Sequence, residues 1–324
     1  MNKQLWRKTG IFALIFVLSV FLLAACGSAD QKNESKDNDK TEVSQTDTFP
    51  LTITDDLGNE VTIEEKPETV VSILPSVTET LFALGLDEEI IGVSDFDNYP
   101  EAALEKDKIG DMDMNAEKII SLNPDVAFLS KYNFDNHADT IKQFEELGIE
   151  VVIIDTEESF EGTYASIELI GKITGQTKEA EEVVSSMKEE LAAIEEKASK
   201  VTEKKKVWVE VSPQPEIYTP GQNTYMNEML NTIGAENAAT GDGWYSVNEE
   251  EAVQLNPDVI VVTYGDFVEN AVEQVLARDG WQEVIAVKNK AVYSVDSDMT
   301  SRTGPRLVNG VEELGKAIYP EIFE

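Results

Sequence analysis

The stretch Glu117-Lys-Ile-Ile-Ser-Leu-Asn-Pro-Asp-Val126 occurs a second time in this chain, as Glu250-Glu-Ala-Val-Gln-Leu-Asn-Pro-Asp-Val259. The two copies lie 133 residues apart at every position (250 − 117 = 133). Each copy predicts a short helix, a corner and then a strand, because proline disfavours helical geometry in the residue before it and so ends the helix. A repeat of this kind predicts two similar halves.

Around the first copy, short apolar runs alternate with helical patterns such as Ile141 to Leu147. Strands that alternate with helices favour a parallel α/β sheet. The stretch Ser76-Val-Thr-Glu79 is typical of a capping box, and we expect it to open a helix that Gly85 closes. The predicted strands of this half are Val70–Leu74, Ile90–Val93, Val126–Leu129 and Val151–Ile154.

The same pattern returns around the second copy. Val207–Val211 corresponds to Val70–Leu74, and a helix from Met226 that Gly234 closes corresponds to the helix closed by Gly85. The fold class is therefore α/β, with two Rossmann-like lobes whose sheets are rich in parallel strands. A hairpin of Leu51 to Thr54 and Glu60 to Ile63 precedes the first lobe, because the residues between them favour a turn.

A helical stretch from Phe160 to Thr202 separates the two halves. Apolar residues recur along it at helical spacing from Ala180 to Val201, which indicates one buried stripe on a long helix. Gly175 predicts a break in this stretch, with Thr177 as the cap of the second helix. Because such a connector is stiff, we expect no large hinge closure between the lobes.

The chain begins with a basic segment and the apolar run Ile11 to Leu23, which is too short for a comfortable membrane span. The run ends in Leu23-Ala-Ala-Cys26, which resembles the bacterial lipoprotein signal and implies a lipid anchor on Cys26 at the extracytoplasmic face of the cell membrane. The predicted organisation is a signal peptide with its Cys (1–26), a disordered tether (27–48), an N-terminal lobe (49–158), a connecting helix (159–203) and a C-terminal lobe (204–324).

Composition excludes several classes of function. The 324 residues carry 26 Lys and Arg against 63 Asp and Glu, so the formal charge is 26 − 63 = −37. A surface this acidic repels phosphate, which excludes nucleic-acid binding as a main task. One Cys and one His exclude disulfides within the chain, thiolate zinc sites and a Cys–His nucleophile pair. We therefore predict neither a cofactor nor a metal site.

Several stretches together resemble one family. These are Asp55-Asp-Leu-Gly-Asn59 with the strand that follows it, Tyr99-Pro100, Ile109-Gly-Asp111 and Arg302-Thr-Gly-Pro-Arg306. With the two lobes, the long helix and the lipoprotein signal, they resemble the substrate-binding lipoproteins of ABC importers, in the helix-linked class that carries cobalamin, ferric siderophores or haem. The resemblance covers residues 49 to 324 and implies a monomeric binding protein, not an enzyme, that delivers its ligand to permease subunits and their ATPase.

The ligand site of two such lobes is expected in the cleft beyond the carboxyl ends of the strands. That position selects Phe96, Met112, Lys131, Tyr132, Tyr218, Trp244, Tyr264, Asp298 and Arg302. In the pattern of the cobalamin binders, Phe96, Tyr218 and Trp244 fall at aromatic pocket positions, and Asp298 and Arg302 fall at polar ones. Met112 departs from this pattern, which has Trp there.

The small number of cationic residues among these candidates also favours a ligand such as cobalamin. A catecholate siderophore is strongly anionic and needs several convergent cations. Among the candidate ligand residues, only Arg302 and Lys131 are cationic. Aromatic faces with few charges suit a large, nearly neutral ligand. Cobalamin is the first choice, a ferric hydroxamate siderophore the second and haem the third.

The resemblance also implies a docking role for two glutamates. In this class, one Glu on each lobe binds permease arginines, and Glu117 and Glu250 match that position in the two copies of the repeat. Charge complementarity of this kind steers association and fixes its register. Two alternatives of another class stay open, namely an enzyme with its active site in the cleft and a lipoprotein that acts as a sensor or adhesin.

Overall fold

The computed structural model describes residues 47–155 and 158–323. Gln45–Glu324 form one compact unit. The predicted signal peptide, the lipid-modified Cys26 and nearly all of the predicted tether lie outside the described residues. No helix within the described ranges is long and apolar enough to cross a membrane.

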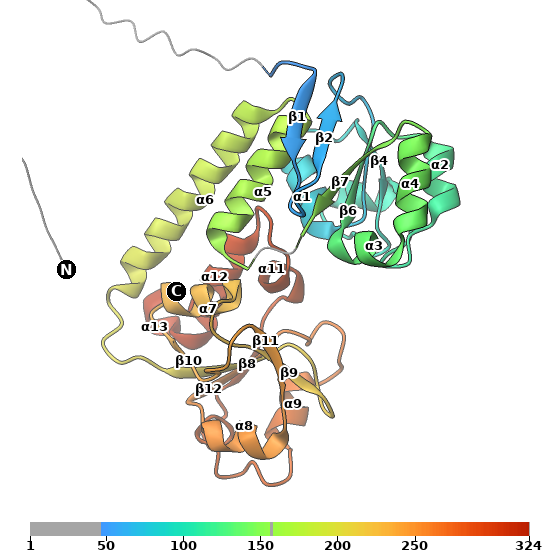
Figure 1. Cartoon of the computed structure of the whole chain (residues 1–324). Helices are drawn as coiled ribbons and strands as arrows, with labels where there is room; N and C mark the ends of the chain where they lie inside the picture. The colour runs from blue at the N-terminus through green and yellow to red at the C-terminus, as the bar shows by residue number, and fades with distance from the viewer. Residues whose placement is uncertain (1–46, 156–157, 324) are drawn as a thin grey trace, which may run out of the picture. The chain divides into compact units, whose positions relative to one another are not determined.

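The first parallel sheet has five strands in the order β5-β4-β3-β6-β7. Figure 1 labels β4, β6 and β7 of this sheet. Every neighbouring pair in it is parallel, as the alternation of strands and helices predicts. Its strands are β3 (Val70–Ser72), β4 (Ile90–Val93), β5 (Asp107–Lys108), β6 (Val126–Ser130) and β7 (Glu150–Ile154). Its helices are α1 (Pro75–Ala83), η1 (Glu101–Glu105), α2 (Ala116–Leu122), α3 (Lys131–Asn136) and α4 (Ala138–Glu146).

The second parallel sheet has four strands in the order β10-β8-β12-β13. Its strands are β8 (Lys206–Glu210), β10 (Glu236–Asn237), β12 (Val259–Val262) and β13 (Val292–Ser294). Its helices are α7 (Tyr225–Thr232), α8 (Glu249–Leu255), α9 (Ala271–Leu276), α10 (Ile285–Lys288), α11 (Ser297–Ser301), α12 (Leu307–Ile318) and α13 (Pro320–Phe323). We call β1–β7 with their helices the first lobe, and β8–β13 with theirs the second lobe.

Both sheets use the repeat in the same way. Val70 lies beside Val126 in the first sheet, and Val207 lies beside Val259 in the second. The strand that follows the Leu-Asn-Pro-Asp corner therefore pairs with the first strand of its own sheet in each lobe. The prediction of two similar α/β lobes is confirmed.

The corner itself is built by its asparagine and aspartate as well as its proline. Asn123 and Asn256 end helices α2 and α8 in the left-handed conformation, with φ of 48° and 44°, which Asn tolerates better than most residues. The carboxylate of Asp125 accepts the backbone N–H of Thr69, and that of Asp258 accepts the N–H of Lys206. Each aspartate thus anchors the start of the neighbouring strand.

Two antiparallel ribbons complete the lobes. β1 (Leu51–Thr54) and β2 (Glu60–Ile63) form the predicted hairpin. In the second lobe, β9 (Ile217–Pro220) pairs with β11 (Trp244–Val247). This second ribbon was not predicted, because a loop rich in proline and glycine gives little strand signal.

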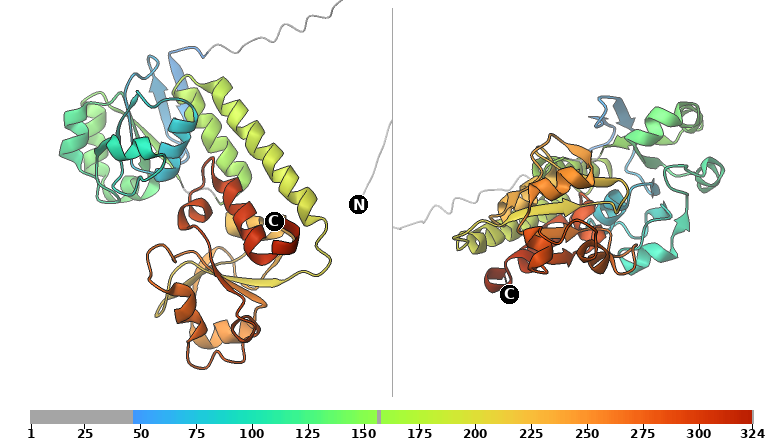
Figure 2. Two further views of the ribbon diagram at one scale, coloured as in Figure 1. Left: turned by 180° about the vertical axis from the view of Figure 1, so that it is seen from behind. Right: turned by 90° about the horizontal axis from the view of Figure 1, so that it is seen from below.

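A helical hairpin connects the lobes, and α5 (Phe160–Ile173) lies beside α6 (Thr177–Ala198) in Figures 1 and 2. Gly175, with φ of 65°, makes the predicted break. Helix α6 has 22 residues and is about 33 Å long at 1.5 Å per residue.

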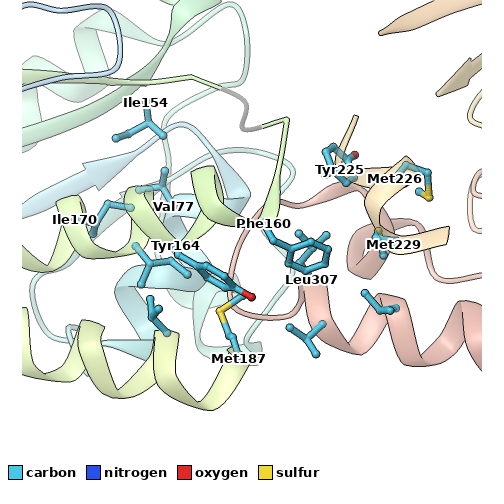
Figure 3. Packing of buried hydrophobic residues seen from close by; sticks show 14 of the residues in the cluster. Val77, Ile154, Phe160, Tyr164, Ile170, Met187, Tyr225, Met226, Met229 and Leu307 are labelled. Atoms are coloured by element: carbon cyan, nitrogen blue, oxygen red, sulfur yellow. The ribbon is translucent and has the colours of Figure 1, made fainter. Parts of the chain in front are cut away.

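One hydrophobic core runs through both lobes and the connector. Figure 3 shows Val77 and Ile154 of the first lobe, Tyr164 and Met187 of the connector, and Met229 of the second lobe in this core. Because close-packed interiors resist deformation, a shared core is consistent with the expected stiffness. The absence of large hinge closure stays a prediction.

Two predicted caps are wrong. Helix α1 begins at Pro75 and Leu74 is its N-cap without a side-chain hydrogen bond, so Ser76 lies inside the first turn. Proline is favoured there because its fixed φ suits the first helical position. Thr177 is the first residue of α6 rather than its cap, and its hydroxyl donates to the carboxylate of Asp47.

Candidate functional site

Two loops and the start of helix α3 lie at the carboxyl edge of the first lobe's sheet. Phe96 follows β4, Met112 follows β5 and Tyr132 follows β6. The backbone N–H of Asp95 donates to the carbonyl of Gly110 at 2.9 Å, which joins the first two loops. The structure therefore brings these predicted residues to one edge.

The loop that carries Met112 is also tied to the start of α3. The side-chain amide of Asn133, the residue after Tyr132, donates to the carbonyl oxygen of Met112 at 2.9 Å. Phe96 and Met112 are 62% and 56% exposed. Large apolar side chains on anchored loops offer a binding surface, because soluble proteins bury most such groups.

Lys131 does not present a free charge at this edge. Its ammonium lies 2.6 Å from the carboxylate of Asp135, one helical turn further along α3. This hydrogen bond raises the pKa of Lys131 above its ordinary value. The lysine stays protonated, but its charge is largely balanced by its neighbour.

In the second lobe, Tyr218 and Trp244 share the outer face of the β9–β11 ribbon. Tyr218 pairs with Ser246, and Trp244 pairs with Pro220. Since directly paired residues of an antiparallel ladder lie on the same face, these two aromatic side chains project together. The opposite face holds the buried Ile217 and Val247.

Trp244 faces the segment that leads out of the first lobe. Its indole N–H donates to the carboxylate of Glu158 at 2.9 Å, and its ring lies 5.4 Å from the ring of Tyr225. Burial raises the pKa of Tyr225, so this hydroxyl stays protonated. The half-buried indole is thus held by one hydrogen bond and one aromatic contact.

The predicted polar residues Asp298 and Arg302 lie where the two lobes touch. Asp298 accepts a hydrogen bond from the side-chain amide of Asn98, in the first lobe, at 2.8 Å. Arg302 pairs with Asp298 at 2.8 Å and donates to the oxygen of Asn98 at 2.9 Å. Both predicted residues therefore take part in contacts between the lobes.

Arg302 also belongs to a buried ion cluster, which we define as Glu79, Arg302 and Arg306. Glu79 of helix α1 accepts from Arg302 at 2.8 Å and from Arg306 at 2.7 Å and 2.8 Å. The side chain of Glu79 is 1% exposed, and those of the arginines are 10% and 15% exposed. The guanidinium of Arg302 is largely occupied by protein partners in this structure.

The sequence prediction missed Glu79, Asn98, Glu158 and Arg306 as members of this region. The capping-box pattern places Glu79 at a helix cap, although a charged residue on an apolar helix face signals a buried partner. Arg302 and Arg306 are four residues apart, which is a spacing that lets two cations reach one carboxylate. Neither signal tells which residue of the other lobe is the partner.

Tyr264 is buried rather than exposed at the edge of its sheet, so the prediction that it lines the cleft is corrected. It is 5% exposed, and its hydroxyl donates to the carboxylate of Glu210 at 2.9 Å. Arg278 donates to the same carboxylate at 2.6 Å and 2.7 Å. Burial, followed by the Glu210 charge, raises the pKa of Tyr264. The ring offers no surface to a ligand here because it completes a buried polar network.

Glu117 and Glu250 occupy equivalent positions in the two lobes. Each is the second residue of its helix, in α2 and α8, and each follows an asparagine N-cap by two residues. Both are exposed, and within the described ranges neither carboxylate has an ion pair or hydrogen bond. Both side chains are therefore free to bind a partner.

A cavity of about 640 Å³ lies at the opposite edge of the second sheet, near the first residues of β8 and β12. Its wall includes Lys200, Lys205, Asp258 and Tyr319. No predicted ligand residue lines it. Among the described residues, no group of three or more His, Cys, Asp or Glu is placed to hold a metal ion.

Asp97, beside Phe96, gives a testable pH dependence. It is 2% exposed, and burial raises its pKa. Because the pKa is higher in the folded than in the unfolded state, this group's contribution to stability is present at low pH and is lost as pH rises through the raised pKa. Asp97→Asn keeps an acceptor for the N–H of Ser94 but cannot ionise.

We therefore expect the melting temperature of Asp97→Asn, relative to the wild type, to increase from pH 4 to pH 7. Thermal unfolding followed by circular dichroism at both pH values measures this difference. Asp95→Asn, at an exposed neighbour, is the control. A wild-type advantage that grows with pH would contradict the expectation.

A family model described as "Periplasmic binding protein" matches residues 70–299. The match spans more than half of the chain and contains both parallel sheets. The chain belongs to the periplasmic binding protein family, which consists of substrate-binding proteins and not of enzymes.

Two relatives refine this class. The chain is 45% identical over 321 residues to the "Uncharacterized ABC transporter substrate-binding lipoprotein YvrC" of Bacillus subtilis, with 98% of this chain and 99% of the relative covered. It is 27% identical over 258 residues to a "Vitamin B12-binding protein" of Vibrio parahaemolyticus, with 77% and 89% covered. The first relative places the chain among substrate-binding proteins of ABC transporters.

A solved structure shows the same fold. It is described as that of a possible iron-binding (periplasmic solute-binding) protein from Staphylococcus epidermidis, with a TM-score of 0.72 and 33% identity. The match covers 79% of this chain and 100% of that one. The α/β fold with two parallel sheets is thus shared with a protein described as possibly iron-binding, whereas the Vibrio relative is named for vitamin B12.

Proposed function

We propose that this protein is the extracytoplasmic receptor of an ABC importer and that its ligand is a metal chelate, with cobalamin as the first candidate. The observation that carries the proposal is the pair of anchored apolar surfaces. Phe96 and Met112 project from the first lobe, and Tyr218 and Trp244 project from the second. A large ligand with apolar faces would contact both.

The charges near these surfaces support a nearly neutral ligand. Arg302 and Lys131 are both paired with carboxylates, and the chain carries a formal charge of −37. An anionic ligand would need unpaired cations to replace its hydration. The corrin ring with its amides meets this condition, and a vitamin B12-binding protein is among the relatives.

A ferric hydroxamate is the second candidate, because it is also a large, nearly neutral ligand. Two observations favour it. Met112 stands where the cobalamin pattern has Trp, and the structural relative at 33% identity is described as possibly iron-binding. Both candidates use the same two surfaces, so only binding measurements separate them.

We also propose that Cys26 carries a lipid anchor and that residues 27–48 link it to the folded unit. The sequence Leu23-Ala-Ala-Cys26 and the lipoprotein relative YvrC support this. Two or more acyl chains would hold the receptor at the membrane durably, which keeps the captured ligand near its permease.

Uptake in cells tests the proposed role. Cells that lack this gene and carry no other receptor for the ligand are complemented with the full chain, and the accumulation of ⁵⁷Co-cyanocobalamin, of a ⁵⁵Fe trihydroxamate and of ⁵⁵Fe-hemin is measured. We expect the chain to restore uptake of one of the three, cobalamin first. Restoration of none, with the protein present at the membrane, would contradict the proposal.

Trp244→Ala tests the second-lobe surface. We expect the dissociation constant for the transported chelate to rise at least about tenfold, which is about 1.4 kcal/mol. The substitution removes the flat indole face that the ligand would contact. Isothermal titration calorimetry measures the constant. Trp281→Phe, at a buried tryptophan of the same lobe, is the matched control. An unchanged constant in Trp244→Ala would make Trp244 a packing residue only.

A further inference from the structure

Phe267 has no role in the function described so far. It is 75% exposed, which is the largest value among the large hydrophobic residues of the described ranges. It lies in the loop that follows β12, at the carboxyl edge of the second sheet. Leaving a phenylalanine side chain in water forgoes about 1.5–3 kcal/mol of burial free energy, and Phe267 is exposed at the edge of the sheet where the ligand site is expected.

The loop of Phe267 is firmly held. The backbone N–H groups of Phe267 and Val268 donate to the carbonyl of Tyr264 at 3.1 Å and 3.0 Å. Tyr264 is held in place by the buried hydrogen-bond network that includes Glu210 and Arg278. The exposed ring therefore stands on a rigid support.

The neighbouring residues leave this loop little room to move. A Cβ atom built on Gly265 would lie 2.0 Å from the hydroxyl oxygen of Ser294 at the end of β13. A side chain at this position would have to displace the Ser294 hydroxyl, because the loop approaches the strand closely. The loop is thus packed against the carboxyl edge of the sheet.

Hydrogen bonds connect this loop to the contact between the lobes. The carboxylate of Asp266 accepts the N–H of Ser297, the first residue of α11, at 3.0 Å. The next residue of α11, Asp298, binds Asn98 of the first lobe at 2.8 Å. Only one short helix therefore separates the Phe267 loop from the first lobe.

On the first lobe, the Phe96 loop is also bonded to helix α11. The carbonyl oxygen of Phe96 accepts from Arg302, which ends α11, at 3.2 Å. Phe96 is 62% exposed, and Lys108 holds its loop through the carbonyls of Ser94 and Asp97. Each lobe thus presents one exposed phenylalanine on a braced loop, and α11 joins the two loops.

We propose that Phe267 is a ligand-contacting residue that acts with Phe96 and selects for ligands with an extended apolar or aromatic face over compact oxyanions. This inference rests on the proposed function and adds a specificity residue to it. Two phenylalanine rings can cover a corrin, a porphyrin or the apolar surface of a hydroxamate chelate. They offer no hydrogen bond to a small tetrahedral anion, whose hydration must be replaced by polar donors.

The test uses the unit Gln45–Glu324, which is compact and contains every described residue. Cyanocobalamin, a ferric trihydroxamate, hemin and molybdate are each titrated into the wild type and into Phe267→Ala by calorimetry. We expect the wild type to bind one of the three chelates and not molybdate. In Phe267→Ala we expect about a tenfold weaker affinity for that chelate and an unchanged melting temperature.

Two further variants separate contact from general hydrophobicity. Phe267→Trp keeps a flat ring and should keep the affinity within about threefold. Leu147→Ala removes an exposed apolar side chain, 52% exposed, before the first residue of β7, and should change nothing.

Two kinds of result would overturn the inference, and they differ in what they leave standing. Equal affinities of the wild type and Phe267→Ala for a bound chelate would remove Phe267 from the site but leave the proposed function intact. Binding of molybdate alone, or of none of the three chelates, would remove the proposed function and this inference with it.

Discussion

Replacing Glu79 with alanine should lower the free energy of unfolding by about 3–5 kcal/mol. The carboxylate is 1% exposed and is the shared partner of Arg302 and Arg306. Removing it leaves two guanidinium groups, 10% and 15% exposed, without their counter-charge. Breaking a buried ion pair by deleting one partner has a cost of this size.

Denaturant unfolding of the unit Gln45–Glu324 measures this effect. Glu88→Ala, at an exposed glutamate of the same lobe without a hydrogen bond or ion pair in the described ranges, is the matched control and should stay within about 0.5 kcal/mol of the wild type. Glu79→Gln should fall between the two, because the amide keeps one acceptor but loses the charge. A loss below about 1 kcal/mol in Glu79→Ala would show that the cluster contributes little to stability.

The second large effect is expected on transport. The double variant Glu117→Ala, Glu250→Ala should reduce the rate of chelate uptake at least about tenfold, which corresponds to about 1.4 kcal/mol, and should leave the dissociation constant of the ligand unchanged. Both carboxylates are exposed at the same position of equivalent helices. A partner with one cationic site for each lobe would lose both contacts.

The matched control for this experiment changes the net charge equally at other positions. Glu181 and Glu273 are exposed, on α6 and α9, and have no ion pair in the described part of the chain. Their double replacement by alanine should leave uptake within about twofold of the wild type. Normal uptake in the Glu117, Glu250 variant would end the docking hypothesis, and an equal loss in both variants would assign the effect to total charge.

Much of the architecture was predictable because it depends on local sequence. The repeat that ends in Val126 and Val259 predicted two sheets with equivalent strands, and these strands have equivalent partners. Gly175 marked the break between α5 and α6, because its positive φ is easily adopted only by glycine. Periodicity and turn residues are visible within a few positions.

The errors arose where a residue outside the recognised pattern decides the local structure. Ser76 resembles a cap, but Pro75 starts the helix and moves Ser76 inside it. Tyr264 follows a strand toward the carboxyl edge of the sheet, which predicted exposure. Whether it lies on the surface or below it depends on Glu210 and Arg278, 54 and 14 residues away.

Contacts between the lobes could not be predicted from local sequence patterns. Glu79 binds Arg302 across 223 residues, and Asn98 binds Asp298 across 200. No periodicity or motif links positions so far apart, since the contact depends on how the two lobes face each other. The candidate ligand residues Phe96, Tyr218 and Trp244 could be selected by position and chemistry. The residues that hold these side chains in place could not be predicted in this way.

The measurement that tests the central claim most directly is a calorimetric titration of Gln45–Glu324 with cyanocobalamin and a ferric trihydroxamate side by side. The account predicts tight one-to-one binding of one of them, cobalamin first. It also predicts a negative heat-capacity change, because apolar surface is buried between the aromatic faces. Heat release from neither ligand would contradict the proposal that this receptor captures a nearly neutral metal chelate.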